Sequence, residues 1–191
     1  MANCDLIFQA FDEEITPKYL PQNGGSHEFN AWFIERGNKQ PQLTSLVRFL
    51  RAWGDYQNEQ PGPHSIPSGQ VMTIWAVDNA HYNERHDVAL RDTLQAIRDT
   101  LRMFFECASP TFPAGEDLLE KYQFKAYFIS RLDAFLESAK QAVNESNQKL
   151  ACGKWQMHLG PSFPCRLAED KDAGARTFDK PAVITENAKS A

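Results

Sequence analysis

Two arginines and one serine are the residues of this sequence whose types and spacing best suit binding chemistry. Arg48 and Arg51 fall on one predicted helix, and Ser65 follows Arg51 by fourteen positions within the segment 61–66. A guanidinium can clamp phosphate oxygens through two parallel hydrogen bonds. A serine at a helix start adds a hydroxyl beside free N–H groups and the positive end of a dipole. The set suits the triphosphate of a nucleotide, although an arginine and a capping serine also serve structural roles in most helical proteins.

Other familiar site motifs are missing from the sequence. It contains no G-x-x-x-x-G-K-[ST], G-x-G-x-x-G, H-E-x-x-H or G-x-S-x-G motif. The four cysteines are Cys4, Cys107, Cys152 and Cys165. They show no C-x-x-C spacing, so we expect free thiols in a reducing compartment. His81 and His86 flank a polar segment, and their spacing favours a solvated loop over a metal-binding loop.

Composition sets the broad class of the protein. The chain has 191 residues, of which 42% are hydrophobic and 12% aromatic, as in a globular protein of about one domain. Its net charge of -5 disfavours binding to a long nucleic acid. No apolar run has the roughly 20 residues of a membrane span, and the N-terminus does not resemble a secretory signal. We therefore expect a cytoplasmic protein that binds neither membranes nor long nucleic acids.

The apolar pattern predicts a mainly α-helical bundle preceded by one short N-terminal β-strand. Residues 4–11 form a short apolar run that is typical of a strand, and proline and glycine residues follow it. One strand cannot satisfy its own backbone groups, so it must pair with another. The sequence thus predicts a strand-and-loop remnant over 1–25, a helical lobe over 26–165 and a flexible, polar tail over 166–191.

Helical spacing of apolar residues begins after the predicted loop. Ser26 is a candidate N-cap, Pro41 fits the first turn of a second helix, and Ser65 and Asp87 are candidate caps of later helices. A last helix is predicted over about 147–158, with Gly-Pro directly after it. The apolar and aromatic positions of these helices are most simply explained as core.

Several segments together resemble the C-terminal helical lobe of the CD-NTase family. The matching runs are Ala-Trp-Phe at 31–33, Leu-Val-Arg-Phe-Leu-Arg-Ala-Trp at 46–53 and Gly-Pro-His-Ser-Ile at 62–66. Two later runs, at 151–155 and 159–164, are similar to the closing helix of the same lobe. The family comprises bacterial anti-phage enzymes similar to animal cyclic GMP-AMP synthase and oligoadenylate synthase. Order and spacing agree over roughly residues 5 to 164.

The resemblance implies roles for particular residues. In the family, a lysine in Lys-Ala-Trp and a serine in Pro-x-Ser-Ile contact the nucleotide triphosphate, and these positions correspond to Arg51 and Ser65. This sequence has Arg51 where the family usually has a lysine. The arginine retains the positive charge but presents it with a different geometry. Arg48, one turn earlier, is a further candidate for nucleotide binding. Asp5 resembles the third carboxylate of the catalytic triad that holds two Mg²⁺ ions.

The resemblance also implies that a catalytic part lies outside this sequence. Family members carry a nucleotidyltransferase core with a Gly-Ser loop and the first two metal-binding acids, and this chain lacks both motifs. We expect a C-terminal half or truncated form of a cyclic di- or oligonucleotide synthase that is inactive alone. A second polypeptide could supply the core and its Mg²⁺ site.

Two further interpretations stay open at the level of the sequence. The chain could be a non-catalytic helical module that binds a nucleotide or a protein. The tail, which ends in Ser190 and Ala191, could also be joined to other proteins by a ubiquitin-like conjugation system, as in some family members. An ordinary disordered tail is the simpler explanation.

Overall fold

The computed structural model describes residues 1–19, 26–111 and 113–170, and within these ranges the chain is helical. The elements in chain order are α1 (Asp5–Ile15), α2 (His27–Lys39), α3 (Pro41–Asn58), α4 (Gly69–Asn79), α5 (His86–Met103), α6 (Lys125–Asn144), α7 (Gln148–Leu159) and the short 3-10 helix η2 (Cys165–Leu167). The prediction of a mainly α-helical bundle is confirmed. None of the described helices combines the length and apolar character needed to cross a bilayer.

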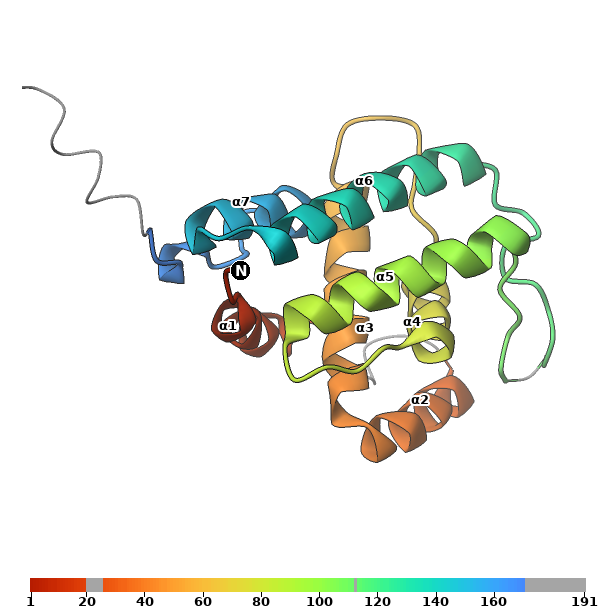
Figure 1. Cartoon of the computed structure of the whole chain (residues 1–191). Helices are drawn as coiled ribbons and strands as arrows, with labels where there is room; N and C mark the ends of the chain where they lie inside the picture. The colour runs from red at the N-terminus through yellow and green to blue at the C-terminus, as the bar shows by residue number, and fades with distance from the viewer. Residues whose placement is uncertain (20–25, 112, 171–191) are drawn as a thin grey trace, which may run out of the picture.

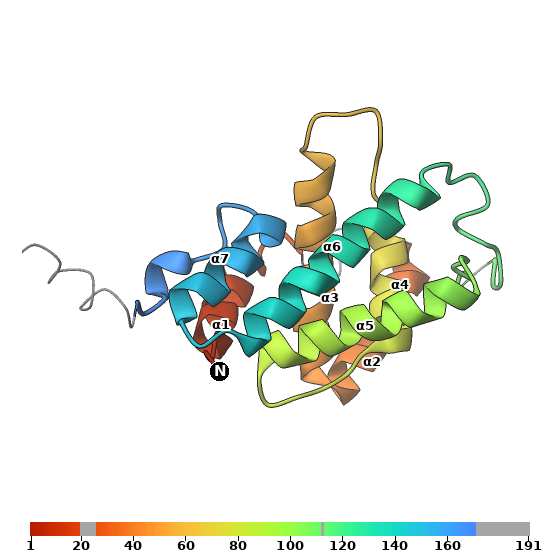
Figure 2. The same ribbon diagram turned by 45° about the horizontal axis from the view of Figure 1, so that its top comes forward.

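The helix α3 runs through the middle of the bundle and contacts most of the others (Figure 1). Two views show α5 and α6 side by side across α3, with α1 and α7 at one end and α2 and α4 at the other (Figures 1 and 2). The largest fully buried side chains are mostly aromatic: Trp53, Trp155, Phe8, Phe11, Phe49, Phe128, Phe135 and Phe163. Their burial is the main force that holds the helices together.

The predicted N-terminal strand is wrong, because its residues form α1. The buried side chains of this helix are Ile7, Phe8, Phe11 and Ile15, which recur at spacings of one, three and four. Such spacing is the helical period, and a short apolar run cannot by itself distinguish a buried strand from a helix. The ring of Phe8 contacts that of Phe163 at 5.0 Å, so α1 packs into the same core as the predicted lobe.

Most of the predicted helix starts agree with the structure. Ser26 is the N-cap of α2, and its hydroxyl accepts a hydrogen bond from a backbone N–H of the first turn. Pro41 is the first residue of α3, and Asn147 caps α7. Asp87 is not a cap, since α5 begins one residue before it and Arg85 is the N-cap. The buried carboxylate of Asp87 pairs with the Arg85 guanidinium at 2.6 Å instead.

The prediction of four free thiols is wrong for two of them. Cys152 on α7 and Cys165 in η2 form a disulfide across a turn that begins at Gly160. The C-x-x-C spacing rule does not detect this pair, because the chain reversal after α7 brings cysteines at distant positions together. Cys4 and Cys107 are free and buried, and burial raises the pKa of each thiol to about 12.

The described beginning of the predicted tail is attached to α7. The backbone N–H of Lys149 donates to the carbonyl of Glu169 at 3.2 Å, and the Glu169 N–H donates to the Gln148 amide oxygen at 2.7 Å. Residues 171–191, which are the rest of the predicted flexible tail and carry its predicted conjugation site, lie outside the described residues.

Candidate functional site

The segment 64–68, which leads into α4, is fixed from two sides. On one side, the Ile66 N–H donates to the side-chain oxygen of Asn58 on α3 at 2.7 Å. On the other side, the Tyr122 hydroxyl donates to the Ser65 carbonyl at 2.5 Å. The segment therefore has one defined path, and it places the exposed Ser65 side chain at the surface just before α4.

Ser65 does not cap α4, contrary to the sequence prediction. The N-cap is Ser68, whose hydroxyl accepts a hydrogen bond from the Val71 N–H at 3.4 Å. Pro67 explains the difference. A helix capped by Ser65 would start at Ile66, and helical conformation is disfavoured at a residue directly before a proline. Ser65 instead lies in the approach to the helix, four residues before its first residue, Gly69.

Arg51 extends from α3 to the first turn of α4. Its guanidinium carbon lies 5.2 Å from the centre of the Tyr19 ring. A Cβ placed on Gly69 would lie 3.2 Å from the Arg51 Nε. The structure thus brings Arg51 next to the first residue of α4, which follows Ser65 by four positions.

The first turn of α4 is electrostatically suited to an anion. The N–H groups of the first helical turn have no carbonyl partner within the helix, and the helix dipole adds partial positive charge there. The first turn of α4 contains no acidic residue, and the Arg51 guanidinium adds a full positive charge beside it. An oxyanion such as a phosphate would therefore be favoured at this helix end.

Tyr19 is a buried phenol that is paired through its hydroxyl. The Tyr19 hydroxyl donates to Asp55 on α3 at 2.8 Å, and the Lys18 ammonium lies 3.1 Å from the same carboxylate. Burial, the largest cause, raises the pKa of Tyr19 to about 12. A cavity of about 170 Å³ lies beside this group, between α1, α3 and the turn after α7.

Arg48, the second predicted nucleotide-binding arginine, has a partner within the chain. Its Nη1 donates to both carboxylate oxygens of Asp12 on α1 at 2.8 Å, and the Ser45 hydroxyl donates to the same carboxylate at 2.8 Å. The side chains of Arg48 and Asp12 are only 15% and 19% exposed. The charge of Arg48 thus connects α1 to α3, and its role in binding a nucleotide stays a prediction.

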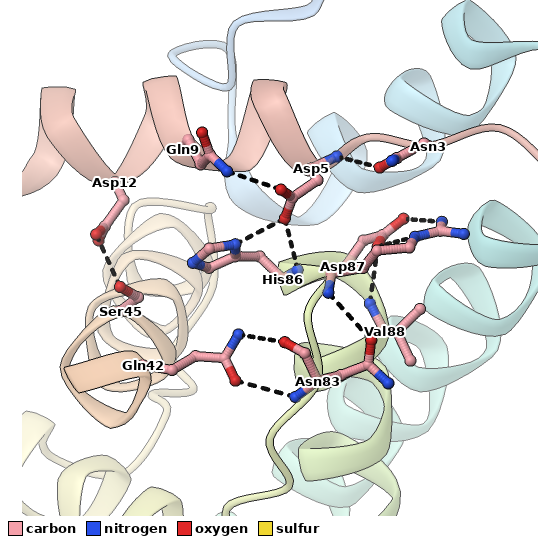
Figure 3. A network of polar contacts seen from close by, with 11 residues as sticks. Asn3, Asp5, Gln9, Asp12, Gln42, Ser45, Asn83, His86, Asp87 and Val88 are labelled. Carbon is pink, nitrogen blue, oxygen red and sulfur yellow. Dashed lines mark hydrogen bonds and ion pairs between the residues drawn. The ribbon is translucent and has the colours of Figure 1, made fainter. Parts of the chain in front are cut away.

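Asp5, the predicted catalytic carboxylate, connects α1 to the first turn of α5 (Figure 3). One of its oxygens accepts a hydrogen bond from the His86 N–H at 2.8 Å and lies 2.7 Å from His86 Nδ1. Its other oxygen accepts from the Gln9 amide at 2.7 Å. Both oxygens therefore have partners inside the described chain.

The surroundings of Asp5 do not form a Mg²⁺ site. Among the described residues, no group of three or more His, Cys, Asp or Glu side chains could hold a metal ion. A two-metal site needs several carboxylates, and the described residues do not bring several together around Asp5. The role of Asp5 as a third metal-binding carboxylate stays a prediction.

Sequence reasoning missed the partners of Arg51. Tyr19 stands in a proline-bearing segment that looked like an ordinary loop, and Gly69 belongs to no motif. Neither has a local signal, because each meets Arg51 only through the packing of α1, α3 and α4. The glycine directly after Pro-Ser was the one available indication, since a side chain there would approach whatever lies at the helix start.

Comparison with solved structures supports the fold assignment. No protein-family model matches the chain. Structures of the DncV cyclic AMP-GMP synthase of Vibrio cholerae match at a TM-score of 0.61 and 18% identity over 74% of this chain. One contains the linear intermediate 5' pppA(3',5')pG and another a nonhydrolyzable GTP. The chain thus has a DncV-like fold, and the match spans only 38% to 39% of those DncV chains.

Proposed function

We propose that this chain is the part of a nucleotidyltransferase that holds the triphosphate of a nucleotide substrate. The observation that carries the proposal is the position of Arg51 beside the acid-free first turn of α4. The segment that contains Ser65 enters the same turn, and its path is fixed by Asn58 and Tyr122. A guanidinium and a helix N-terminus are two independent donors for phosphate oxygens.

In this proposal the chain is the C-terminal half of a CD-NTase of the bacterial anti-phage systems. The complete enzyme would join nucleotides into a cyclic or oligomeric product. In that reaction a hydroxyl of one nucleotide attacks the α-phosphate of another and pyrophosphate leaves. The support for this reading is the DncV-like fold together with the sequence motifs that contain Arg51 and Ser65. A second polypeptide or a further part of a longer protein would supply the carboxylates and Mg²⁺.

The cellular setting is part of the same proposal. Nucleoside triphosphates are abundant in the cytoplasm, so we place the protein there, and a role in anti-phage defence follows from the family resemblance. Attachment of the C-terminus by a ubiquitin-like conjugation system stays a prediction. Expression with a bulky residue added after Ala191 tests it, because unchanged conjugation in cells would contradict it.

Isothermal titration of the full chain with ATP, tripolyphosphate and adenosine tests triphosphate binding. We expect ATP and tripolyphosphate to bind and adenosine to bind at least tenfold more weakly, because the site contacts the phosphates. Arg51→Ala should weaken ATP binding at least tenfold. Arg102→Ala is the matched control, since it removes an exposed arginine from α5 and should leave the affinity unchanged. Equal binding of ATP by the wild type and Arg51→Ala would contradict the proposal.

A second candidate function is a helical module that binds a nucleotide without catalysis. The observation in its favour is that Arg51 and the first turn of α4 would be enough to bind a triphosphate without a further group. Incubation of the full chain with ATP, GTP and Mg²⁺, followed by chromatography, tests catalysis directly. We expect no product from the chain alone. Product that appears only after addition of a separate nucleotidyltransferase core would favour the enzyme, whereas binding without product would favour the module.

A further inference from the structure

We propose that Tyr19 and Gly69 are positioning residues that hold the Arg51 guanidinium against the first turn of α4, ready to bind a triphosphate. This inference rests on the proposed function and deepens it. Neither residue would touch the nucleotide in this arrangement. Each would act through Arg51, one by offering an aromatic face and the other by leaving space.

Tyr19 is itself held in place and can therefore fix another side chain. It is only 6% exposed, and its hydroxyl donates to Asp55 at 2.8 Å. Two cations lie near the ring, with the Lys18 ammonium 5.1 Å and the Arg51 guanidinium carbon 5.2 Å from its centre. A cation over an aromatic face is attracted by the negative charge of that face. The ring thus fixes the orientation of Arg51 from one side.

Gly69 leaves the space that Arg51 occupies. A Cβ on this residue would lie 3.2 Å from the Arg51 Nε and 3.8 Å from both its Cζ and Nη2. A contact of 3.2 Å is shorter than ordinary van der Waals contact, so the guanidinium would have to shift by a few tenths of an ångström. The backbone of Gly69 is not in the left-handed region, so alanine is sterically acceptable to the helix itself.

The arrangement also explains why an arginine suits this position. Its planar guanidinium can stack on Tyr19 and still present N–H groups at its edge to a phosphate, whereas a lysine ammonium is a compact, strongly hydrated charge. A long side chain that is already oriented loses less rotamer freedom when the ligand binds. Triphosphate affinity should therefore depend on Tyr19 and Gly69, but only while Arg51 is present.

A double-mutant cycle with tripolyphosphate as the probe tests this dependence in the full chain. Tyr19→Leu and Gly69→Ala should each weaken binding about fivefold in the wild type and less than 1.5-fold in the Arg51→Ala background. Tyr19→Phe, which keeps the ring, should stay within twofold of the wild type. Gly69→Ala guards against misfolding, because alanine is a better helix former than glycine. Equal losses with and without Arg51 would overturn the positioning role and leave triphosphate binding intact.

An independent readout separates this inference from the proposed function. In ¹⁵N-labelled protein, the Arg51 Nε–Hε signal should be shifted by the Tyr19 ring current, and the shift should disappear in Tyr19→Leu and persist in Tyr19→Phe. This measurement needs no ligand. A wild-type chain that fails to bind tripolyphosphate would overturn the proposed function, whereas an Arg51 signal that is insensitive to Tyr19→Leu would overturn the positioning by Tyr19.

Discussion

The first turns of α5 and α4 solve the same electrostatic problem in opposite ways. At α5 the anion comes from the chain, since the Asp5 carboxylate accepts a hydrogen bond from the His86 N–H at 2.8 Å. At α4 the first turn has no acidic residue, and a cation, Arg51, lies beside it. The helix end at α5 has its anion within the chain, whereas the proposed function assigns the anion at α4 to a bound phosphate.

The largest expected loss of stability comes from removing the disulfide. The disulfide lies next to residues that pack on α1, and α1 carries the Asp5 carboxylate at the first turn of α5. Cys152 and Cys165 close a loop with a sequence separation of 13, next to Phe163, whose ring contacts Phe8 on α1. Cys165→Ser should lower the free energy of unfolding by about 3 kcal/mol, because the unfolded chain regains freedom. Urea denaturation measures the loss.

Cys107→Ser is the control for the disulfide, because it removes a thiol that has no disulfide partner. A dithiol reductant should lower the free energy of unfolding of Cys107→Ser by the same amount as that of the wild type. The reductant should leave the free energy of unfolding of Cys165→Ser unchanged. If the reductant leaves the wild-type stability unchanged, the disulfide does not form in solution. At native conditions both the oxidised and the reduced protein should still bind triphosphate, since neither Arg51 nor the first turn of α4 contains these cysteines.

The second prediction concerns pH, which must be controlled before the two helix ends are compared. Burial, with a smaller contribution from Arg131, lowers the pKa of His158 from 6.5 to about 4. Between these values the unfolded chain binds a proton that the folded chain does not, so stability falls as the pH falls. At pH 5 the loss relative to pH 8 should be about 2 kcal/mol from this group.

Urea denaturation of His158→Gln at both pH values isolates this contribution. The variant has no titratable ring, so its stability should change less between pH 8 and pH 5 than that of the wild type. An identical change in both proteins would show that the buried ring does not govern acid stability. Comparisons of the two helix ends are therefore best made at pH 8.

A third prediction concerns removal of the Asp5 carboxylate from the first turn of α5. Asp5→Ala removes the acceptor of the His86 N–H and should lower the free energy of unfolding by about 1.5 kcal/mol, the typical size of a hydrogen bond to a charged group. Asp5→Asn should lose less, because the amide oxygen can still accept. Tripolyphosphate affinity at pH 8 should be unchanged in both variants. A tenfold loss of affinity would instead place Asp5 at the ligand.

Local signals in the sequence predict the helix starts, whereas contacts between distant segments leave no such signal. Ser26 and Pro41 identified helix starts correctly because a cap acts within a few residues of itself. The run 4–11 was misread because Leu6, which is 74% exposed, completes an apolar stretch that conceals the helical period. The sequence indicated Arg51 and the loop before α4, but not the Tyr19 ring, since that contact depends on packing between distant segments.

The smallest expected change in stability comes from a substitution that gives the first turn of α4 a carboxylate of its own, as α5 has. Ser68→Asp keeps a good N-cap and places a carboxylate at the turn beside Arg51. The chain would then supply its own anion, so stability should rise by about 0.5 kcal/mol while ATP affinity falls about tenfold through repulsion. Ser68→Asn, a neutral cap of the same shape, should leave both quantities near the wild type. If Ser68→Asp stabilises the protein and ATP still binds equally well, the first turn of α4 does not face the phosphates. If Ser68→Asn weakens ATP binding as strongly, then the serine hydroxyl, and not the charge balance of the turn, is what the ligand requires.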